Sequence, residues 1–224
     1  MTEMSGVPRS KQEAKAVYDR LSRWYDMLSG LAEGPSRKIG VRLLNAQPGE
    51  MILEIGFGTG HQILAIAQAV GPTGSVYGID ISEGMNRITQ ARIQEAGLSD
   101  RVVLTCQDAT SLPYPLGFFD ALFLSFTLEL FDTPEIPLFL AECHRVVKDG
   151  GRICVVALAK RERDSWAVRL YEWAHRRFPK SIDCRPIFVE QALTEARFLP
   201  IAIQRLSMFS LPVDVLIAGK ASSS

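Results

Sequence analysis

The hydrophobic positions of this chain alternate between short continuous runs and segments with helical spacing. Apolar runs of strand length occupy residues 51–56, 75–80, 102–108, 118–126 and 152–158. Strands that are apolar throughout are typical of a parallel sheet covered on both faces. Because helix-period segments separate the runs, the pattern predicts successive βαβ units.

The segment after the first run predicts a helix that lies against the sheet. Its apolar residues recur at positions i, i+3, i+4 and i+7, which is one face of a helix. These residues are Ile63, Ile66, Ala67 and Val70.

A second helix is predicted after Asp132. Thr133 is the expected N-cap and Pro134 the first helical residue. The paired glycines Gly150 and Gly151 are expected to end this helix and release the chain into the fifth strand. Its expected buried face comprises Ile136, Phe139, Leu140, Cys143 and Val147.

The C-terminal part predicts further helices at 165–178 and 188–197, followed by strands at 201–209 and 213–220. So short a link between the last two strands permits only an antiparallel hairpin. The predicted fold class is therefore α/β: a doubly wound, seven-stranded, mainly parallel sheet with a C-terminal antiparallel hairpin, in one domain over 1–224.

Charge and composition exclude several kinds of partner. The chain has 25 basic and 25 acidic residues, so no overall positive field attracts nucleic acid. No run approaches the ~20 apolar residues of a membrane span, and the charged N-terminus lacks a signal sequence. The four cysteines have no C-x-x-C spacing, which argues against a metal site and a disulfide framework. We expect a cytoplasmic protein without a metal.

The strongest local motif is a glycine-rich turn between the first strand and the helix after it. Gly56, Gly58 and Gly60 allow a sharp turn and a close approach of the backbone to a ligand. A dinucleotide fingerprint needs its third glycine at position 61, which is His61. Glu54 precedes the turn, and its carboxylate suits a ligand with a positive charge, such as an amino acid ammonium.

Acidic residues also stand at the ends of the next two predicted strands. Asp80 is placed to accept hydrogen bonds from the hydroxyls of a ribose. Asp108 could accept the exocyclic amine of an adenine, and the Ala109 backbone N–H could donate to the same base. Together with Glu54, these groups match the three parts of an adenosyl amino acid.

The chain resembles the class I S-adenosylmethionine (SAM)-dependent methyltransferases, and among them the ubiquinone and menaquinone C-methyltransferases. Residues 53–60 are similar to their first motif, 76–85 to the acidic motif that follows, 106–119 to their D-A-x-x-L-P-F segment, and 142–151 to the E-x-x-R-V-L-K-P-G-G run. Asp149 stands where that run usually has proline, a departure that leaves the ligand-binding motifs intact.

This resemblance implies a Rossmann-like methyltransferase with SAM as cofactor and S-adenosylhomocysteine as product. In similar enzymes an N-terminal helical lid, here 1–46, folds over SAM, with Tyr25 touching the cofactor; the alternative is that Tyr18 and Tyr25 merely pack. The implied cofactor site comprises Tyr18, Tyr25, Glu54, Gly56, Gly58, Gly60, Asp80, Ile81, Met85, Asp108, Ala109 and Ser125.

The acceptor side is expected in a helical segment at 159–199. His175 in this segment and Glu129 after the fourth strand are the candidate proton acceptors, whereas His61 and His144 are expected to be structural. An aromatic and basic stripe in the segment either packs on the core or forms an interfacial helix that collects a lipid substrate. The stripe comprises Trp166, Leu170, Trp173 and Arg177.

The resemblance implies methyl transfer to a small, largely apolar acceptor, with a quinol- or phenol-type ring carbon as the leading hypothesis. The alternatives are N-methylation of a phospholipid headgroup, N- or O-methylation of another small molecule, SAM binding without catalysis, and a nicotinamide-dependent oxidoreductase. We expect a monomer or homodimer with at most peripheral membrane contact.

Overall fold

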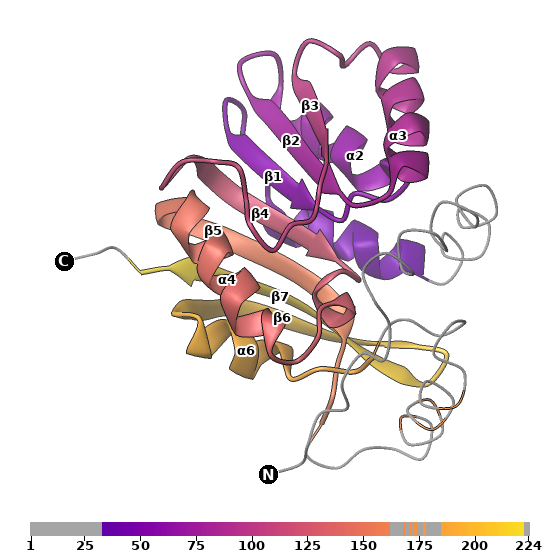
Figure 1. Cartoon of the computed structure of the whole chain (residues 1–224), viewed down its shortest axis with the longest axis vertical. Coiled ribbons are helices and arrows are strands. Elements are labelled where there is room, and N and C mark those ends of the chain that lie inside the picture. The colour runs from indigo at the N-terminus through magenta and orange to yellow at the C-terminus, as the bar shows by residue number, and fades with distance from the viewer. Residues whose placement is uncertain are drawn as a thin grey trace.

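Seven strands form one sheet in the computed structural model, which describes residues 33–161, 168, 171, 173, 177 and 185–221. Their order is β3-β2-β1-β4-β5-β7-β6 (Figure 1). The strands are β1 (Met51–Ile55), β2 (Ser75–Asp80), β3 (Val102–Cys106), β4 (Phe119–Ser125), β5 (Val147–Leu158), β6 (Phe198–Met208) and β7 (Leu211–Lys220). This sheet confirms the predicted fold class.

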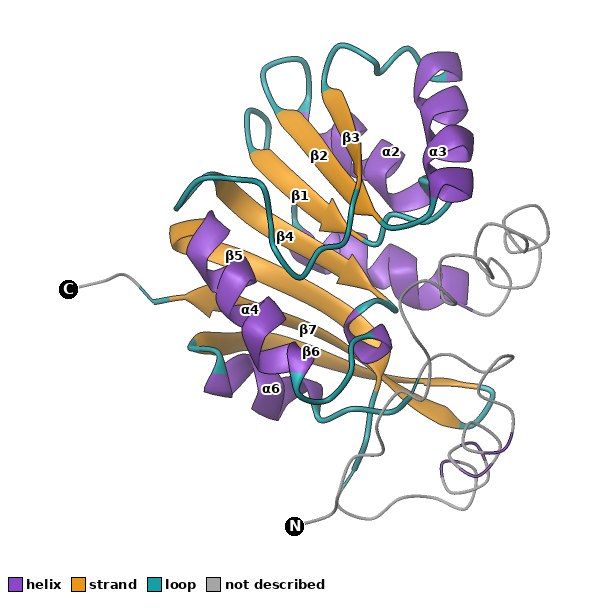
Figure 2. Ribbon diagram, viewed as in Figure 1, coloured by secondary structure: helices purple, strands orange, loops and turns teal. Residues whose placement is uncertain are grey.

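The first five strands run parallel, and the last two form the predicted hairpin. β1 pairs in parallel with β2 and β4, and β3 and β5 extend the sheet outward from these two strands. β7 is antiparallel to both β5 and β6. The carboxyl ends of β1, β2 and β4 therefore meet at one edge of the sheet (Figure 2).

Helices cover both faces of the sheet (Figure 1). One hydrophobic cluster joins the sheet to α4 (Glu135–Val146) and α6 (Val189–Glu195). A second cluster joins the other face to α2 (His61–Val70), α3 (Glu83–Glu95) and a helix at 33–44. The four apolar residues predicted to face the sheet are the buried residues of α2, which confirms that stripe.

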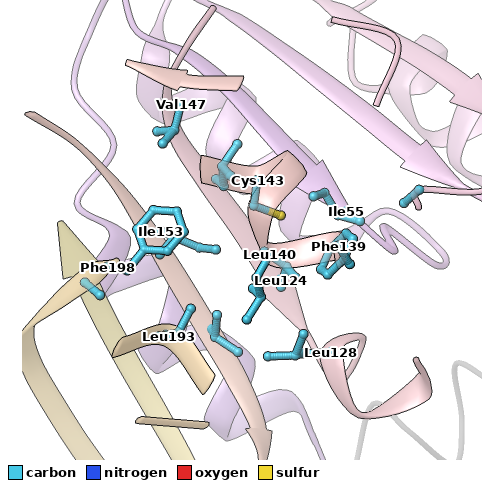
Figure 3. Close-up of a cluster of buried hydrophobic side chains, with 14 of the residues drawn as sticks. Ile55, Leu124, Leu128, Phe139, Leu140, Cys143, Val147, Ile153, Leu193 and Phe198 are labelled. Atoms are coloured by element: carbon cyan, nitrogen blue, oxygen red, sulfur yellow. The ribbon is translucent and has the colours of Figure 1, made fainter. Parts of the chain in front are cut away.

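The first cluster also anchors a short 3-10 helix, η1 (Leu128–Leu130), just beyond β4. Leu128 is fully buried and lies among side chains of the sheet and of α4 (Figure 3). Because Leu128 is fixed in the core, the neighbouring Glu129 is held at the edge where the strands end.

The predicted N-cap of α4 is wrong. The helix begins at Glu135 without a side-chain cap from Thr133, whose hydroxyl is buried and lacks a partner. Asp132 serves this end instead: its carboxylate accepts from the Thr133 N–H at 2.8 Å, and its carbonyl accepts from the Glu135 N–H at 2.9 Å.

The predicted end of α4 is also wrong. The helix ends at Val146, and Val147 is already extended and paired with Phe119 of β4. The pairing then jumps to Ala121 and Arg152, so the four residues between form a bulge within β5. Gly150 has a φ of 74° in this bulge, and the glycine pair therefore serves a turn within the strand rather than a helix end.

Arg145 and Glu142, within 142–151, tie α4 to the loop before β4. The Arg145 guanidinium bonds the Glu142 carboxylate at 2.7 Å, the Tyr114 carbonyl at 2.7 Å and the Leu112 carbonyl at 3.0 Å. We expect Arg145→Ala to lower the free energy of unfolding by about 2 kcal/mol, because several charge-assisted hydrogen bonds are lost.

Urea unfolding followed by circular dichroism measures this loss. The matched control is Arg205→Ala, which removes a surface ion pair with Glu190 at 3.7 Å and is expected to change stability by less than about 0.5 kcal/mol. Equal effects of the two substitutions would contradict the role given to Arg145.

Candidate functional site

The glycine-rich turn lies between β1 and α2, as the sequence predicts. Gly56, Gly58 and Gly60 have φ values of 73°, 53° and 85°, which glycine adopts without the strain that a side chain would bring. The Gly56 N–H donates to the carbonyl of Ile79 at 2.8 Å, so the turn is fastened to β2. At Gly58 a Cβ would meet no atom within 4 Å, and the backbone there is open to a ligand.

Asp80 at the end of β2 connects this turn to the next loop. One carboxylate oxygen accepts from the Gly58 N–H at 2.9 Å, and the other accepts from the Ser82 N–H at 2.9 Å. The Thr89 hydroxyl of α3 donates to the Gly58 carbonyl at 2.8 Å. Asp80 therefore shapes the turn by bonding the backbone on both sides of it.

Glu54 carries a buried carboxylate beneath the turn. The residue is only 1% exposed, and its Oε2 atom has no hydrogen-bond partner. Burial raises the pKa of Glu54 well above its ordinary value; the Arg37 cation opposes this rise and nearby Asp80 adds to it. A buried, unpartnered carboxylate is suited to a cationic ligand group that would both bond it and neutralise it.

Arg37 joins the helix at 33–44 to the site. Its guanidinium lies 5.8 Å from the centre of the Phe126 ring and pairs with the Glu33 carboxylate. Its Nε atom is buried without a partner. No sequence motif marks this residue, which lies on the helix just before β1.

The other expected cofactor residues line the same edge. Asp108 follows β3 and accepts from the Thr110 N–H at 2.9 Å, and Ala109 beside it is buried. Met85 is buried in the first turn of α3, and Ile81 lies half-buried between β2 and that helix. Ser125 ends β4 with a buried hydroxyl that has no partner. The structure thus brings these residues together as strand ends and the loops after them.

Several sequence-based candidates lie outside the described residues: Tyr18, Tyr25, Trp166, Leu170 and His175. Within the described part, Trp173 is 54% exposed, and its membership of a packing or interfacial stripe stays a prediction. His144 packs edge-on against Phe198 with ring centres 5.3 Å apart, and His61 lies 3.0 Å from the Arg92 guanidinium.

Glu129 is fully buried on η1 at the carboxyl end of β4. One carboxylate oxygen accepts from the Leu158 N–H of β5 at 3.1 Å, and the other has no partner. Burial raises the pKa of Glu129 to about 8; nearby Glu33 also raises it, whereas Arg185 lowers it.

The raised pKa of Glu129 makes stability depend on pH. Between its ordinary value of 4.5 and about 8, the folded state holds a proton that the unfolded state has released, so the free energy of unfolding falls as pH rises. Between pH 6 and pH 7.5, we expect the free energy of unfolding of the wild type to fall by about 2 kcal/mol more than that of Glu129→Gln. Urea titrations at both values measure this difference.

Glu190→Gln is the control for that experiment, because Glu190 is an exposed glutamate on α6. Its stability is expected to follow the wild-type pH profile. Identical profiles for Glu129→Gln and the wild type would show that Glu129 is ionised in the folded protein near neutral pH.

The described residues fit a cationic adenosyl amino acid. The unpartnered Glu54 oxygen offers a buried hydrogen-bond acceptor, Asp80 and Asp108 offer further carboxylates, and the turn at Gly58 leaves room beside the backbone. A pyrophosphate would meet three acidic groups here, which its own negative charge disfavours.

Comparisons with known proteins agree with this geometry. A family model described as a methyltransferase domain matches residues 52–151. A ubiquinone/menaquinone biosynthesis C-methyltransferase from Burkholderia vietnamiensis is 30% identical over 77% of this chain and 73% of its own length. A demethylmenaquinone methyltransferase from Anoxybacillus flavithermus is 33% identical over 66% of this chain and 63% of its own length. The chain belongs to the SAM-dependent methyltransferases.

Family membership identifies SAM as the cofactor and favours it over a nicotinamide. The likeness to solved structures concerns the fold alone. The [4+2]-cyclase SpnF superposes with a TM-score of 0.76 over 98% of this chain and 100% of its own, at 21% identity. Because that neighbour is a cyclase, the fold does not by itself determine the reaction. Within the described residues, no helix is long and apolar enough to cross a membrane.

Proposed function

We propose that the protein transfers the methyl group of SAM to a ring carbon of a small, largely apolar acceptor of the quinol or phenol type. Methyl transfer is supported mainly by one observation: Glu54, Asp80 and the glycine-rich turn lie together at one edge of the sheet. The acceptor class is supported by the relatives, which are named for ubiquinone and menaquinone biosynthesis.

The residues proposed to hold SAM follow from the groups that the site presents. Glu54 would bind the ammonium, Asp80 the ribose hydroxyls, and Asp108 with Ala109 the adenine. When bound, SAM supplies a methyl group on a positively charged sulfur. Ile81 and Met85 would pack against the nucleoside and exclude water from it, and Ser125 would border the transfer site.

The principal task of the protein in such a reaction is positioning. Holding two reactants at near-attack distance can contribute roughly 7–11 kcal/mol to lowering the barrier. Buried walls at the ends of β4 and β5 serve that purpose, since Phe126 and Leu158 are both only a few per cent exposed. The segments proposed as lid, 1–46, and acceptor side, 159–199, would complete the enclosure within one domain.

Methyl transfer from radiolabelled SAM into a panel of acceptors tests this function. The panel contains a naphthol, a phenol, a phosphatidylethanolamine vesicle and a simple amine. We expect label in the naphthol or phenol, with mass and NMR spectra placing the methyl group on carbon. Label on nitrogen would support the headgroup alternative, label on oxygen would favour O-methylation, and SAM binding without any transfer would favour a binding protein.

A further inference from the structure

Two buried charged side chains near the ends of β4 and β5 have polar atoms without partners. Glu129 is 0% exposed and Arg185 is 2% exposed. Glu129 Oε2, Arg185 Nε and Arg185 Nη1 all lack a hydrogen bond. Buried groups of this kind are rare in folded proteins, and they often mark a place where a ligand supplies the missing partner.

The fold holds these two side chains close to each other. Glu129 accepts from the Leu158 N–H at 3.1 Å, and the Leu158 carbonyl accepts from the Ile187 N–H at 3.0 Å. Arg185, two residues before Ile187, donates to the Phe131 carbonyl at 2.8 Å, just after η1. Glu129 and Arg185 form no hydrogen bond with each other. They are close enough for each to shift the pKa of the other electrostatically.

Their position relative to the cofactor residues fits an acceptor site. Glu54 and Asp80 lie on β1 and β2, whereas Glu129 and Arg185 lie beyond β4 and β5 on the other side of β1. Ile55 pairs with Leu124, so the ends of β1 and β4 are adjacent. A molecule at this pair would therefore sit beside the cofactor rather than in its place.

A hydroxyl group can satisfy both side chains at once. It has one O–H to donate to Glu129 and lone pairs to accept from Arg185. We propose that Glu129 and Arg185 bind the acceptor through a phenolic or enolic hydroxyl, an inference that rests on the proposed function. Glu129 takes the proton of this hydroxyl, and Arg185 binds the oxygen anion that remains.

The proton and electron balance of this step is simple. The acceptor O–H bond breaks, its proton goes to Glu129 Oε2, and the electron pair stays on the acceptor oxygen, where it delocalises to the ring carbon. That carbon forms the new C–C bond as the S–C bond of SAM breaks with its pair left on sulfur. The ring carbon then releases its hydrogen as a proton, the product oxygen takes back the proton held by Glu129, and one proton per turnover reaches the solvent.

The electrostatic surroundings support this assignment. The charged groups facing Glu129 are Glu33 from the helix at 33–44 and Arg185, while Asp132 faces Arg185. With a pKa of about 8, Glu129 is mostly protonated at neutral pH, and the carboxylate form that accepts the acceptor's proton increases as the pH rises towards 8. Arg185 would repel an ammonium, so the pair selects a hydroxyl-bearing acceptor over a cationic headgroup.

Binding of two probes tests the inference independently of turnover. Calorimetry with the protein loaded with S-adenosylhomocysteine compares 1-naphthol with 1-methoxynaphthalene, which lacks the O–H. We expect the wild type to bind 1-naphthol at least about 10-fold more tightly. Glu129→Gln, which can still accept from the Leu158 N–H, and Arg185→Gln should each remove most of this preference.

The controls are Glu190→Gln and Arg205→Gln, a surface pair that should retain the preference. With a labelled acceptor, Glu129→Gln should lower kcat about 100-fold while the Kd for SAM is unchanged. If Arg185→Gln does not fold, Arg185→Lys takes its place, because lysine keeps the charge but not the planar guanidinium. If neither Arg185 variant folds, the result for Glu129→Gln decides.

Equal affinity of the wild type for the two probes, no binding of 1-naphthol, or a preference that survives in Glu129→Gln would each overturn the inference. These results differ from failure of the proposed function, which is the loss of SAM binding or of methyl transfer in the wild type itself.

Discussion

Replacing Asp80 with alanine is expected to raise the Kd for SAM at least about 100-fold. The Asp80 carboxylate bonds the Gly58 and Ser82 N–H groups, each at 2.9 Å, and is the group proposed to bind the ribose. Each charge-assisted hydrogen bond is worth about 1.5–3 kcal/mol, so losing two of them with the ligand corresponds to at least a factor of about 100. Isothermal titration calorimetry of SAM measures the change.

Asp100→Ala is the matched control for this prediction. Asp100 is an exposed aspartate that pairs with Arg101 at 3.1 Å before β3, at the opposite edge of the sheet. Its removal should change the Kd for SAM less than about twofold. If Asp80→Ala binds SAM as tightly as Asp100→Ala, the ribose is held elsewhere.

Gly56→Ala is expected to lower the free energy of unfolding by about 3 kcal/mol or more and to abolish measurable SAM binding. A Cβ at this position would lie 2.3 Å from the Thr127 hydroxyl oxygen and 2.7 Å from its methyl carbon, on a backbone with φ of 73°. Thr127 is buried beyond β4, so it cannot move aside into solvent.

Two variants separate the steric clash from backbone strain. Gly97→Ala has a similar φ of 66° with nothing within 4 Å of the new Cβ, and it should cost only about 1 kcal/mol. The double variant Gly56→Ala/Thr127→Ala removes the clashing atoms and should recover part of the lost stability. If thermal unfolding shows that Gly56→Ala is no less stable than Gly97→Ala, the close packing of the glycine-rich turn against the end of β4 would be contradicted.

The sequence predicted those features that local chemistry determines. Continuous apolar runs indicated the buried strands, helical spacing identified the face of α2, and the glycine turn with Asp80 marked the strand ends that meet at one edge. Thr133 and Gly150 were assigned wrong roles, because the neighbouring Asp132 could serve the helix end equally well, and because a glycine pair suits a strand bulge as readily as a helix end.

Two arginines of the site, unlike its carboxylates, were beyond sequence reasoning. Arg37 and Arg185 lie outside the strand-end motifs, and only the folded chain brings Arg37 near Glu54 and Arg185 near Glu129. Thr127 is likewise significant only because β4 places it against Gly56. Contacts of this kind depend on tertiary packing, which no local pattern encodes. The one partial signal was Glu129, an acidic residue in an apolar stretch after a strand.

Calorimetry of the wild-type protein with SAM, S-adenosylhomocysteine and 5′-methylthioadenosine tests the central claim most directly, because the last compound lacks the amino acid that Glu54 is proposed to bind. We predict one site for SAM and for S-adenosylhomocysteine, and at least about 10-fold weaker binding of 5′-methylthioadenosine. No heat from either SAM or S-adenosylhomocysteine, with the protein shown to be folded, would contradict the account.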